Sequence, residues 1–125
     1  MNNEFTKEER LFRAVIPNNM YWKKEERPSS AAFKTRETDG LSTDRQAGRA
    51  IDECIDFIHA HLAGRVVSVS CQDCWESEID VCYNPIHTEE LHNPYHTLLR
   101  KQDGGNLSNG QARRLAEACI VHDQA

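Results

Sequence analysis

The chain has 125 residues and a formal charge of −5 at pH 7, from 15 Lys and Arg against 20 Asp and Glu. Apolar residues make up 38% and aromatic residues 7%, which exceeds what a disordered chain carries. No apolar run approaches the roughly 18 residues of a transmembrane helix, and the start, MNNEFTKEER, lacks the apolar stretch of a signal peptide. We therefore expect a cytoplasmic protein of one domain, residues 1–125, with no membrane partner.

Charge is distributed unevenly along the chain. Residues 1–49 carry a net charge of +2, whereas residues 50–125 carry −7. Between Asp52 and Glu90, nine acids face a single base, Arg65. Because a surface of that sign repels phosphate backbones, nucleic-acid binding through the C-terminal half is not expected. The N-terminal part offers either a solvated mixed-charge surface or a basic face formed by Arg10, Arg13, Lys23, Lys24, Arg27, Lys34 and Arg36.

The N-terminal third predicts one strand and a long loop. Residues 1–10 are polar and are expected to form a frayed lead-in or a short helical turn. Leu11–Ile16 is rich in strand formers and stops at a proline and two asparagines. Ser29–Phe33 is expected to be a short strand or an irregular segment. Gly40–Asp44 indicates a turn into a short extended piece, with Ser42, Thr43 or Asp44 available to cap the next helix.

The middle of the chain predicts a helix followed by two strands. Apolar residues recur at steps of three and four between Gln46 and Leu62, which gives one stripe along a helix that ends before Gly64. Arg65–Cys71 and Ile79–Tyr83 both alternate apolar and polar residues. The short connection between these two strands suggests a hairpin or a neighbouring pair.

The C-terminal third predicts a last strand, Tyr95–Lys101, and a last helix. The helix begins at Ser108, whose spacing to Gln111 fits a capping box. Because the strands run consecutively, the sequence predicts an α+β fold. We expect a small antiparallel or mixed sheet of about four strands with two main helices packed on one face.

Five cysteines without an export signal speak against a disulfide framework. Cys54 and Cys119 fall at apolar positions of the predicted helices and are assigned to packing.

The most specific local pattern is Cys71-x-x-Cys74, followed by Cys82 and then by His87 or His92. A two-residue spacer lets two thiolates bind one zinc ion, which needs about four ligands. The pattern lacks a second close pair, and Cys82 is expected inside a strand. We therefore favour cysteines at a strand end and no cofactor, and zinc on Cys71, Cys74, Cys82 and His87 is the alternative. A redox role is less favoured, because redox pairs open a helix and nearby acids raise the pKa of the thiols.

Three histidines, His87, His92 and His96, lie in the stretch NPIHTEELHNPYH. Imidazole titrates near neutral pH and can act as acid and base in a metal-free nuclease or bind a divalent ion. The spacings run through loop, so no regular element fixes all three on one face, and loop histidines are often merely exposed. His96 is the best single candidate because it begins a predicted strand.

The N-terminal half adds candidates for binding. Arg13 interrupts an apolar strand, so its guanidinium needs solvent or an anionic partner. Hydroxyls of Ser29, Ser30 and Ser42 can bind a ligand, although turn hydroxyls more often bond their own backbone.

The segments LFRAVIP, RPSSAAF and GLSTDR, with NPYHTLL before the helix QARRLAEAC, resemble a family of small bacterial proteins without an established activity. That family has an arginine near the start and Pro-Ser-Ser-x-x-Phe, Gly-Leu-Ser and Asn-Pro-x-His segments. The resemblance spans Leu11 to Cys119 and implies a single bacterial domain. It does not include Cys71 and Cys74. The binding positions that it marks are Arg13, Ser29, Ser30, Phe33, Leu41, Ser42 and His96.

A fainter resemblance is to ADP-ribosyltransferase-like toxins, which begin with a strand carrying an arginine or histidine and place serine or threonine on a later strand. Arg13 and Ser42-Thr43 match that pattern. The catalytic glutamate of those toxins has no convincing counterpart, and the only candidates are Glu89 and Glu90.

The favoured hypothesis is a cytosolic bacterial protein that binds another protein, as an accessory or immunity component of a conflict or defence system. Its acidic region would complement a partner with a basic face. The alternative is a small toxin-like enzyme that acts on a nucleotide or RNA, ADP-ribosyltransferase-like or a ribonuclease. Its catalytic candidates are Arg13, which would bind phosphate, Ser42, and His96 as acid or base.

Overall fold

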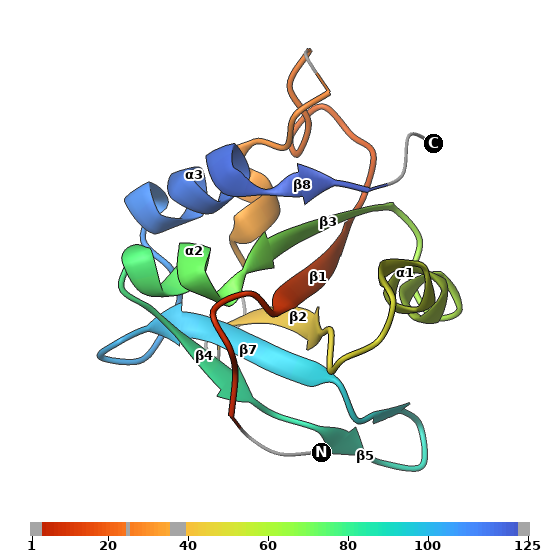
Figure 1. The fold of residues 1–125 in the computed structure, drawn as a ribbon. Helices are drawn as coiled ribbons and strands as arrows, with labels where there is room; N and C mark the ends of the chain where they lie inside the picture. Colours follow the sequence, from red (N-terminus) through yellow and green to blue (C-terminus); the bar gives the residue numbers. More distant parts are fainter. Residues whose placement is uncertain (1–3, 25, 36–39, 123–125) are drawn as a thin grey trace.

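The computed structural model describes residues 4–24, 26–35 and 40–122, so Arg36 lies outside the described residues. No helix in these ranges is long and apolar enough to cross a membrane. In chain order, the elements are β1 (Arg10–Val15), the 3-10 helix η1 (Ser30–Phe33), β2 (Leu41–Arg45), α1 (Ile51–His59), β3 (Arg65–Ser70), α2 (Cys71–Glu76), β4 (Ile79–Tyr83), β5 (Ile86–His87), β6 (His92–Asn93), β7 (His96–Lys101), α3 (Asn109–Ala118) and β8 (Ile120–Val121) (Figure 1).

The centre of the molecule is a six-stranded sheet in the order β4-β7-β2-β1-β3-β8, in which every neighbouring pair is antiparallel. β5 and β6 form a separate two-stranded ribbon. The predicted α+β class with an antiparallel sheet is confirmed, but the count of about four strands was wrong. The sequence predicted only a short extended piece at Gly40–Asp44. It was not counted as a strand, because the buried side of β2 contains Arg45 as well as Leu41 and Thr43 and so lacks an apolar alternation.

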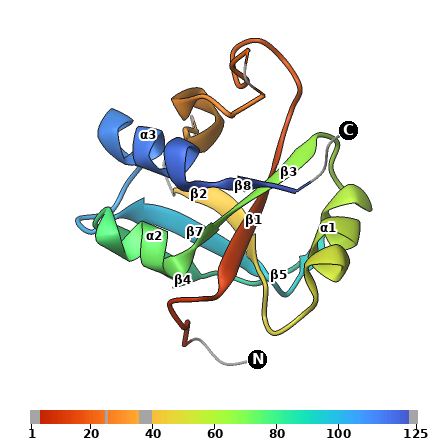
Figure 2. The same ribbon diagram turned by 45° about the horizontal axis from the view of Figure 1, so that its top comes forward.

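The two faces of the sheet carry different helices. Successive side chains of a strand point to opposite faces. Leu11 of β1 packs in a core cluster with Leu115 of α3, whereas Phe12 packs in a second cluster with Cys54 and Ile58 of α1. α1 therefore covers one face, and α3 with α2 and η1 covers the other (Figures 1 and 2). The expectation of two main helices on one face is not met.

The connection between β3 and β4 is a helix rather than a hairpin turn. Ser70 accepts a hydrogen bond from the backbone N–H of Asp73 at 3.0 Å, and the carboxylate of Asp73 accepts one from the N–H of Ser70. This capping box starts α2, which carries the chain across the sheet. β4 then pairs with β7 at the sheet edge and β3 pairs with β1 and β8, so the predicted β3–β4 pairing was wrong.

The boundaries of the two long helices differ in how well they were predicted. α1 is shorter than the predicted 46–62, and its N-cap is Ala50 rather than Ser42, Thr43 or Asp44, which lie in β2. At α3, Ser108 and Gln111 form the predicted capping box. Ser29–Phe33, expected as a strand or irregular, forms η1 over most of its length.

The described part of the N-terminal lead-in is bonded to the rest of the chain. The carbonyls of Lys7 and Glu9 accept hydrogen bonds from Gln72 and Cys71 of α2, at 3.0 and 2.9 Å. Residues 1–3 lie outside the described ranges.

Candidate functional site

A cavity of about 360 Å³ lies between α1, the middle strands of the sheet and the β5–β6 ribbon. Cavities of this size suit a small organic ligand. Three of its lining residues, Arg13, Ser42 and His96, are the catalytic candidates predicted from the sequence. The lining residues are Phe12, Arg13, Ala14, Ser42, Thr43, Asp44, Phe57, Ile58, His61, Leu62, Ile86, Leu91, Asn93 and His96.

The walls of the cavity are largely apolar. α1 and the turn after it supply Phe57, Ile58 and Leu62, and the ribbon supplies Ile86 and Leu91. The ring of Phe57 meets those of Tyr95 and His61 edge to face, with centroids 5.1 and 5.0 Å apart. These contacts fix the orientation of the Phe57 ring. The cavity therefore combines flat apolar surface with a few polar groups, as binding sites for small molecules do.

The polar centre of the site is His96 on β7. Its Nδ1 lies 2.9 Å from the carbonyl oxygen of Asn84, a contact that is a hydrogen bond only when Nδ1 carries the proton. This tautomer leaves Nε2 as an acceptor, and Nε2 lies 3.1 Å from the hydroxyl oxygen of Ser42. Ser42 is exposed. The side-chain nitrogen of Asn84 also lies 3.3 Å from Nδ1. In the tautomer that carries the proton on Nδ1, the Ser42 hydroxyl donates to a neutral imidazole nitrogen, an arrangement compatible with general-base catalysis.

Asp44 lies beside this pair. It is the register partner of His96 across the β2–β7 ladder, so the two side chains emerge on the same face. Its Oδ1 accepts a hydrogen bond of 2.8 Å from the side chain of Asn93. Burial raises the pKa of Asp44, and the hydrogen bond from Asn93 and the positive potential of His96, Arg49 and His61 oppose that rise.

His61 is a lining residue that the sequence analysis missed. It follows α1, and its ring stacks edge-on against Phe57, four residues earlier. The signal was present, since residues four apart on a helix lie on one face. Two histidines, His61 and His96, therefore line one cavity together with the carboxylate of Asp44.

Arg13 joins three elements at the edge of the cavity. The pairing of β1 with β2 ends at Phe12. Beyond this point, the Arg13 guanidinium donates to the carbonyl of Ser42 at 3.0 Å and to that of Ala32 in η1 at 2.8 Å. Burial lowers the pKa of Arg13, and no carboxylate of the described residues pairs with it. The side chain of Arg13 thus connects β1 to β2 and to η1.

The remaining sequence-predicted binding residues lie elsewhere. Phe33 and Leu41 are each 1% exposed and belong to the main core. The Ser29 hydroxyl donates to the carbonyl of Met20 at 2.6 Å. Ser29 and Ser30 line a different cavity, beside α3.

The four candidate zinc ligands are not brought together. Cys71 directly follows β3 and begins α2, Cys74 lies one turn further along α2, and both are fully buried in the main core. Cys82 alternates with core residues Ile79 and Val81 on β4 and so faces the other side of the sheet. His87 lies on the ribbon, within hydrogen-bonding distance of His92, with the two Nδ1 atoms 3.2 Å apart. Across the described ranges, no cluster of three or more His, Cys, Asp or Glu side chains has metal-binding geometry.

The Cys71-x-x-Cys74 pair does open a helix, as redox pairs do, but its thiols are held in the unreactive, protonated form. Burial raises the pKa of Cys71 to about 12, with a smaller contribution from Glu9. Burial also raises the pKa of Cys74, and Cys71 and Asp73 add to the rise. Both thiols therefore stay protonated at neutral pH.

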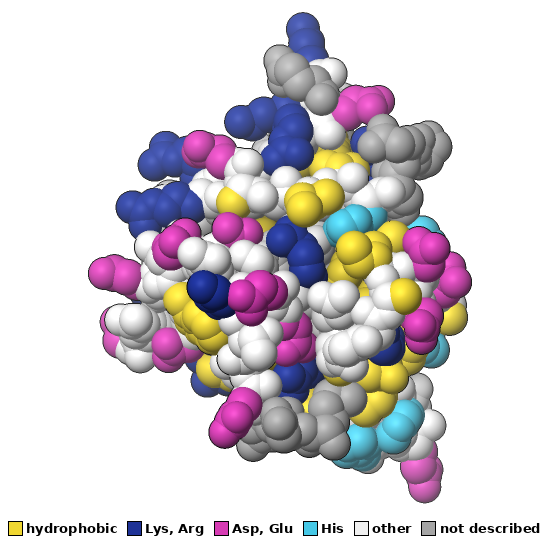
Figure 3. Space-filling view, viewed as in Figure 1, with side chains coloured by type: hydrophobic (Ala, Val, Ile, Leu, Met, Phe, Trp, Pro, Cys, Tyr) yellow, Lys and Arg dark blue, Asp and Glu magenta, His cyan; other side chains and the backbone are white. Residues whose placement is uncertain are grey.

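The acidic residues between Asp52 and Glu90 are divided between two sides of the molecule. Asp52, Glu53 and Asp56 are exposed on α1, whereas Glu76 and Glu78 are exposed at the end of α2. α1 and α2 lie on opposite sides (Figures 1 and 2). Acidic side chains accordingly form separate groups at the two flanks of the surface, rather than one continuous patch across the face in view (Figure 3).

Comparison of the chain with protein-family models, with curated proteins and with solved structures gives no significant match.

Proposed function

We propose that the protein is a small enzyme that cleaves RNA or a related nucleotide substrate by acid–base chemistry in the cavity beside α1. The observation that carries this proposal is the hydrogen-bonded chain from the Asn84 carbonyl through His96 to the Ser42 hydroxyl. It holds an unprotonated imidazole nitrogen against a hydroxyl group, in a cavity large enough for a nucleobase.

The reaction that fits these groups is attack of a ribose 2′-hydroxyl on the adjacent phosphate. His96 Nε2 takes the proton of the 2′-hydroxyl as the new O–P bond forms. His61, in its imidazolium form, gives a proton to the departing 5′-oxygen as the old P–O bond breaks. The products are a 2′,3′-cyclic phosphate and a 5′-hydroxyl end, and the two histidines exchange protonation states.

Other groups of the cavity support this substrate class. Phe57 and the apolar residues of the ribbon give a base the flat surface on which it stacks. Asp44 and Asn93 offer hydrogen-bonding groups to its edge, and the guanidinium of Arg49 places a positive charge near Asp44. The cavity lining contains no glutamate, so RNA cleavage is favoured over an ADP-ribosyltransferase reaction.

The test is incubation of the purified protein with a fluorescent single-stranded RNA and, separately, with NAD. We expect cleavage of RNA to 2′,3′-cyclic ends, loss of at least a hundredfold in rate in His96→Ala and His61→Ala, and a smaller loss in Ser42→Ala. His87→Ala, an exposed histidine outside the cavity, is the matched control. Equal rates in wild type and His96→Ala, with folds intact by circular dichroism, would remove the proposal, and NAD consumption would favour the transferase.

A second proposal keeps the protein-binding hypothesis, as an accessory or immunity component in the bacterial cytoplasm. Its support is the group of three exposed carboxylates on α1, Asp52, Glu53 and Asp56, which would attract a partner with a basic face. Pull-down from the native host should recover a stoichiometric protein whose binding weakens with salt and in Asp52→Asn/Asp56→Asn. If neither salt nor the double substitution weakens binding, the carboxylates of α1 are excluded as the binding surface.

A further inference from the structure

A second cavity, of about 400 Å³, lies between α3 and the loop that follows β1. Its lining includes three cations, Lys23, Arg27 and Arg113, together with Ser29 and Ser30. Glu117 is the single acid among the lining residues. The walls therefore carry more positive than negative charge, in a protein whose formal net charge is −5.

Arg27 explains why cations from distant parts of the chain meet here. Its Nη2 donates to the carbonyls of Ala116, Glu117 and Cys119 at 3.1, 3.2 and 2.9 Å. These carbonyls belong to the C-terminal end of α3, where unpaired carbonyls favour a cation. These three hydrogen bonds attach the loop to α3 and so bring Lys23 to the side of the helix that carries Arg113.

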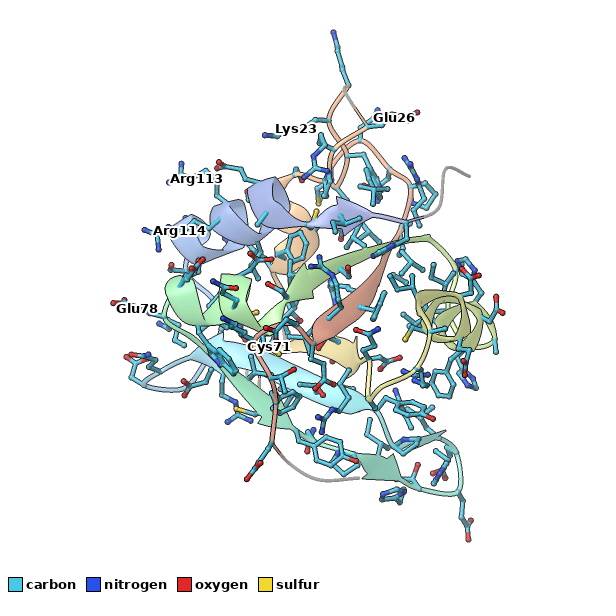
Figure 4. The ribbon with its side chains drawn as sticks, in the orientation of Figure 1. Lys23, Glu26, Cys71, Glu78, Arg113 and Arg114 are labelled. Atoms are coloured by element: carbon cyan, nitrogen blue, oxygen red, sulfur yellow. The ribbon has the colours of Figure 1, made fainter. Side chains whose placement is uncertain are left out.

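The other cations of this surface are not neutralised. Within the described part of the chain, the side chains of Lys23, Arg113 and Arg114 make no hydrogen bond or ion pair. Glu26, which also belongs to this loop, lies 4.0 Å from Arg65. Lys23, Arg113 and Arg114 project outward from the α3 side of the molecule (Figure 4), and dark blue side chains gather there in the space-filling view (Figure 3).

The Ser30 hydroxyl supplies a polar group without an internal partner. Ser29 already donates to Met20, whereas no described residue hydrogen-bonds the Ser30 hydroxyl. A hydroxyl that is free to donate, flanked by lysine and arginine donors in a concave surface, matches the oxygens of a phosphate group. Lysine and arginine give the charge, and the hydroxyl gives a directed hydrogen bond.

We propose that this cavity binds a phosphate group. Lys23, Arg113 and Ser30 donate to its oxygens, and Arg27 contributes charge while it remains bonded to α3. Lys24 and Arg114, the sequence neighbours of Lys23 and Arg113, are also exposed and extend the positive surface. A phosphodiester backbone, which presents several phosphates in a row, therefore binds more tightly than a single phosphate.

This site is separate from the one proposed for catalysis. The catalytic cavity adjoins α1, on the opposite face of the sheet from α3 (Figure 2). It shares no lining residue with the phosphate site. The two proposals can therefore fail independently.

The test measures fluorescence anisotropy of a labelled 2′-O-methyl RNA 12-mer, which has no free 2′-hydroxyl and is not cleaved by the proposed reaction. Inorganic phosphate and ADP are added as competitors, to separate a polymer site from a site for free phosphate. We expect RNA binding that weakens steeply with salt, at least tenfold weaker binding in Arg113→Glu/Arg114→Glu, and tighter binding in Glu117→Gln. Lys7→Glu, an exposed base elsewhere, is the matched control and should change affinity by less than twofold.

Each outcome decides between alternatives. Competition by ADP or phosphate at equal affinity to RNA assigns the site to a free phosphate ligand, and much weaker competition assigns it to a polymer backbone. The proposal is overturned if the Arg113/Arg114 double variant binds with wild-type affinity. It is also overturned if none of the three probes binds at low salt. His96→Ala should bind this RNA as wild type does, so a loss there would locate binding in the catalytic cavity instead.

Discussion

Glu9 and Arg45 form a two-pronged ion pair in which Nε and Nη2 of the arginine donate to the two carboxylate oxygens at 2.8 and 2.9 Å. Their side chains are only 4% and 10% exposed, for Arg45 and Glu9 respectively. The ring of Phe5 lies over the guanidinium at 4.1 Å. The pair thus attaches the chain before β1 to the central strand β2 and neutralises a buried cation.

Removal of Glu9 should strongly destabilise the fold. Glu9→Ala removes both charge-assisted hydrogen bonds between this carboxylate and the buried guanidinium of Arg45, which costs about 3–5 kcal/mol of unfolding free energy. Urea denaturation measures the loss. Glu8→Ala, at an exposed neighbouring carboxylate, should change the unfolding free energy by no more than about 0.5 kcal/mol. Similar small effects of both substitutions would mean that the Glu9–Arg45 pair contributes little.

The same pair shows why part of the sheet could not be predicted from the sequence. β2 reads Leu-Ser-Thr-Asp-Arg, and its buried side consists of Leu41, Thr43 and Arg45. A buried arginine is stable only with a partner such as Glu9, 36 residues away. Local patterns contain no information on that contact, so the segment was expected as a turn into a short extended piece and was not counted as a strand of the sheet. Strands with apolar alternation, such as β3, were predicted correctly.

Local signals did suffice where the stabilising contacts are themselves local. Ser108 and Gln111 start α3 as predicted. The same motif at Ser70 and Asp73 was readable as the start of α2, and it was overlooked because Val67 and Val69 suggested a strand that continued to Cys71. The order of strands depends on contacts distant in sequence, and this is why the predicted β3–β4 pairing failed.

Most residues of the candidate site could be selected from the sequence, but the way in which the fold brings them together could not be predicted. Ser42 and His96 were selected separately, and only the β2–β7 register places them within 3.1 Å of each other. Arg13 was selected as a phosphate ligand, and the structure instead bonds it to two backbone carbonyls. For His61, the spacing of four residues from Phe57 was visible in the sequence, but its place in the cavity depends on where α1 lies over the sheet.

The buried thiols should be inert in the folded protein. Cys71 and Cys74 are fully buried, and burial raises the pKa of Cys71 to about 12. Cys54 and Cys119 are also buried, with raised pKa values. Because thiolate is the reactive form, a disulfide exchange reagent should modify only the half-buried Cys82 rapidly in native protein and all five cysteines after unfolding. The check is mass spectrometry of the modified chain, and rapid native modification of Cys71 or Cys74 would reopen the redox interpretation.

Gly64 should resist substitution. Its φ is +124°, and an added Cβ would lie 2.7 Å from the carbonyl oxygen of Val15, so Gly64→Ala combines backbone strain with a clash against β1. We expect a loss of about 3 kcal/mol in unfolding free energy. Gly48→Ala is the control, because its φ of +72° is also strained but the space around it is open, and its cost should be about 1 kcal/mol. Equal losses in the two variants would show that the contact with Val15 relaxes freely.

Asp44 should make stability depend on pH in a direction opposite to that of a salt-bridged acid. Burial raises its pKa in the folded protein above the ordinary value, so the folded state binds the proton more tightly than the unfolded chain does. The resulting stabilisation is present below the unfolded pKa, about 4, and is lost as pH rises through the folded pKa. At pH 7, the folded protein therefore holds an unfavourably desolvated carboxylate.

Asp44→Asn tests this relationship and its link to the site. The amide oxygen of the new side chain can still accept the hydrogen bond from Asn93, while the buried charge is removed. The melting temperature should rise at pH 7, and the gain should disappear as the pH is lowered below about 4. Asp103→Asn, at an exposed turn position, should show little change at either pH. In the RNA cleavage assay of the proposed function, Asp44→Asn should be slower than wild type, because the variant removes the carboxylate beside His96 and Asn93. If Asp44→Asn is less stable than wild type at all pH values, the buried charge of Asp44 does not destabilise the folded protein.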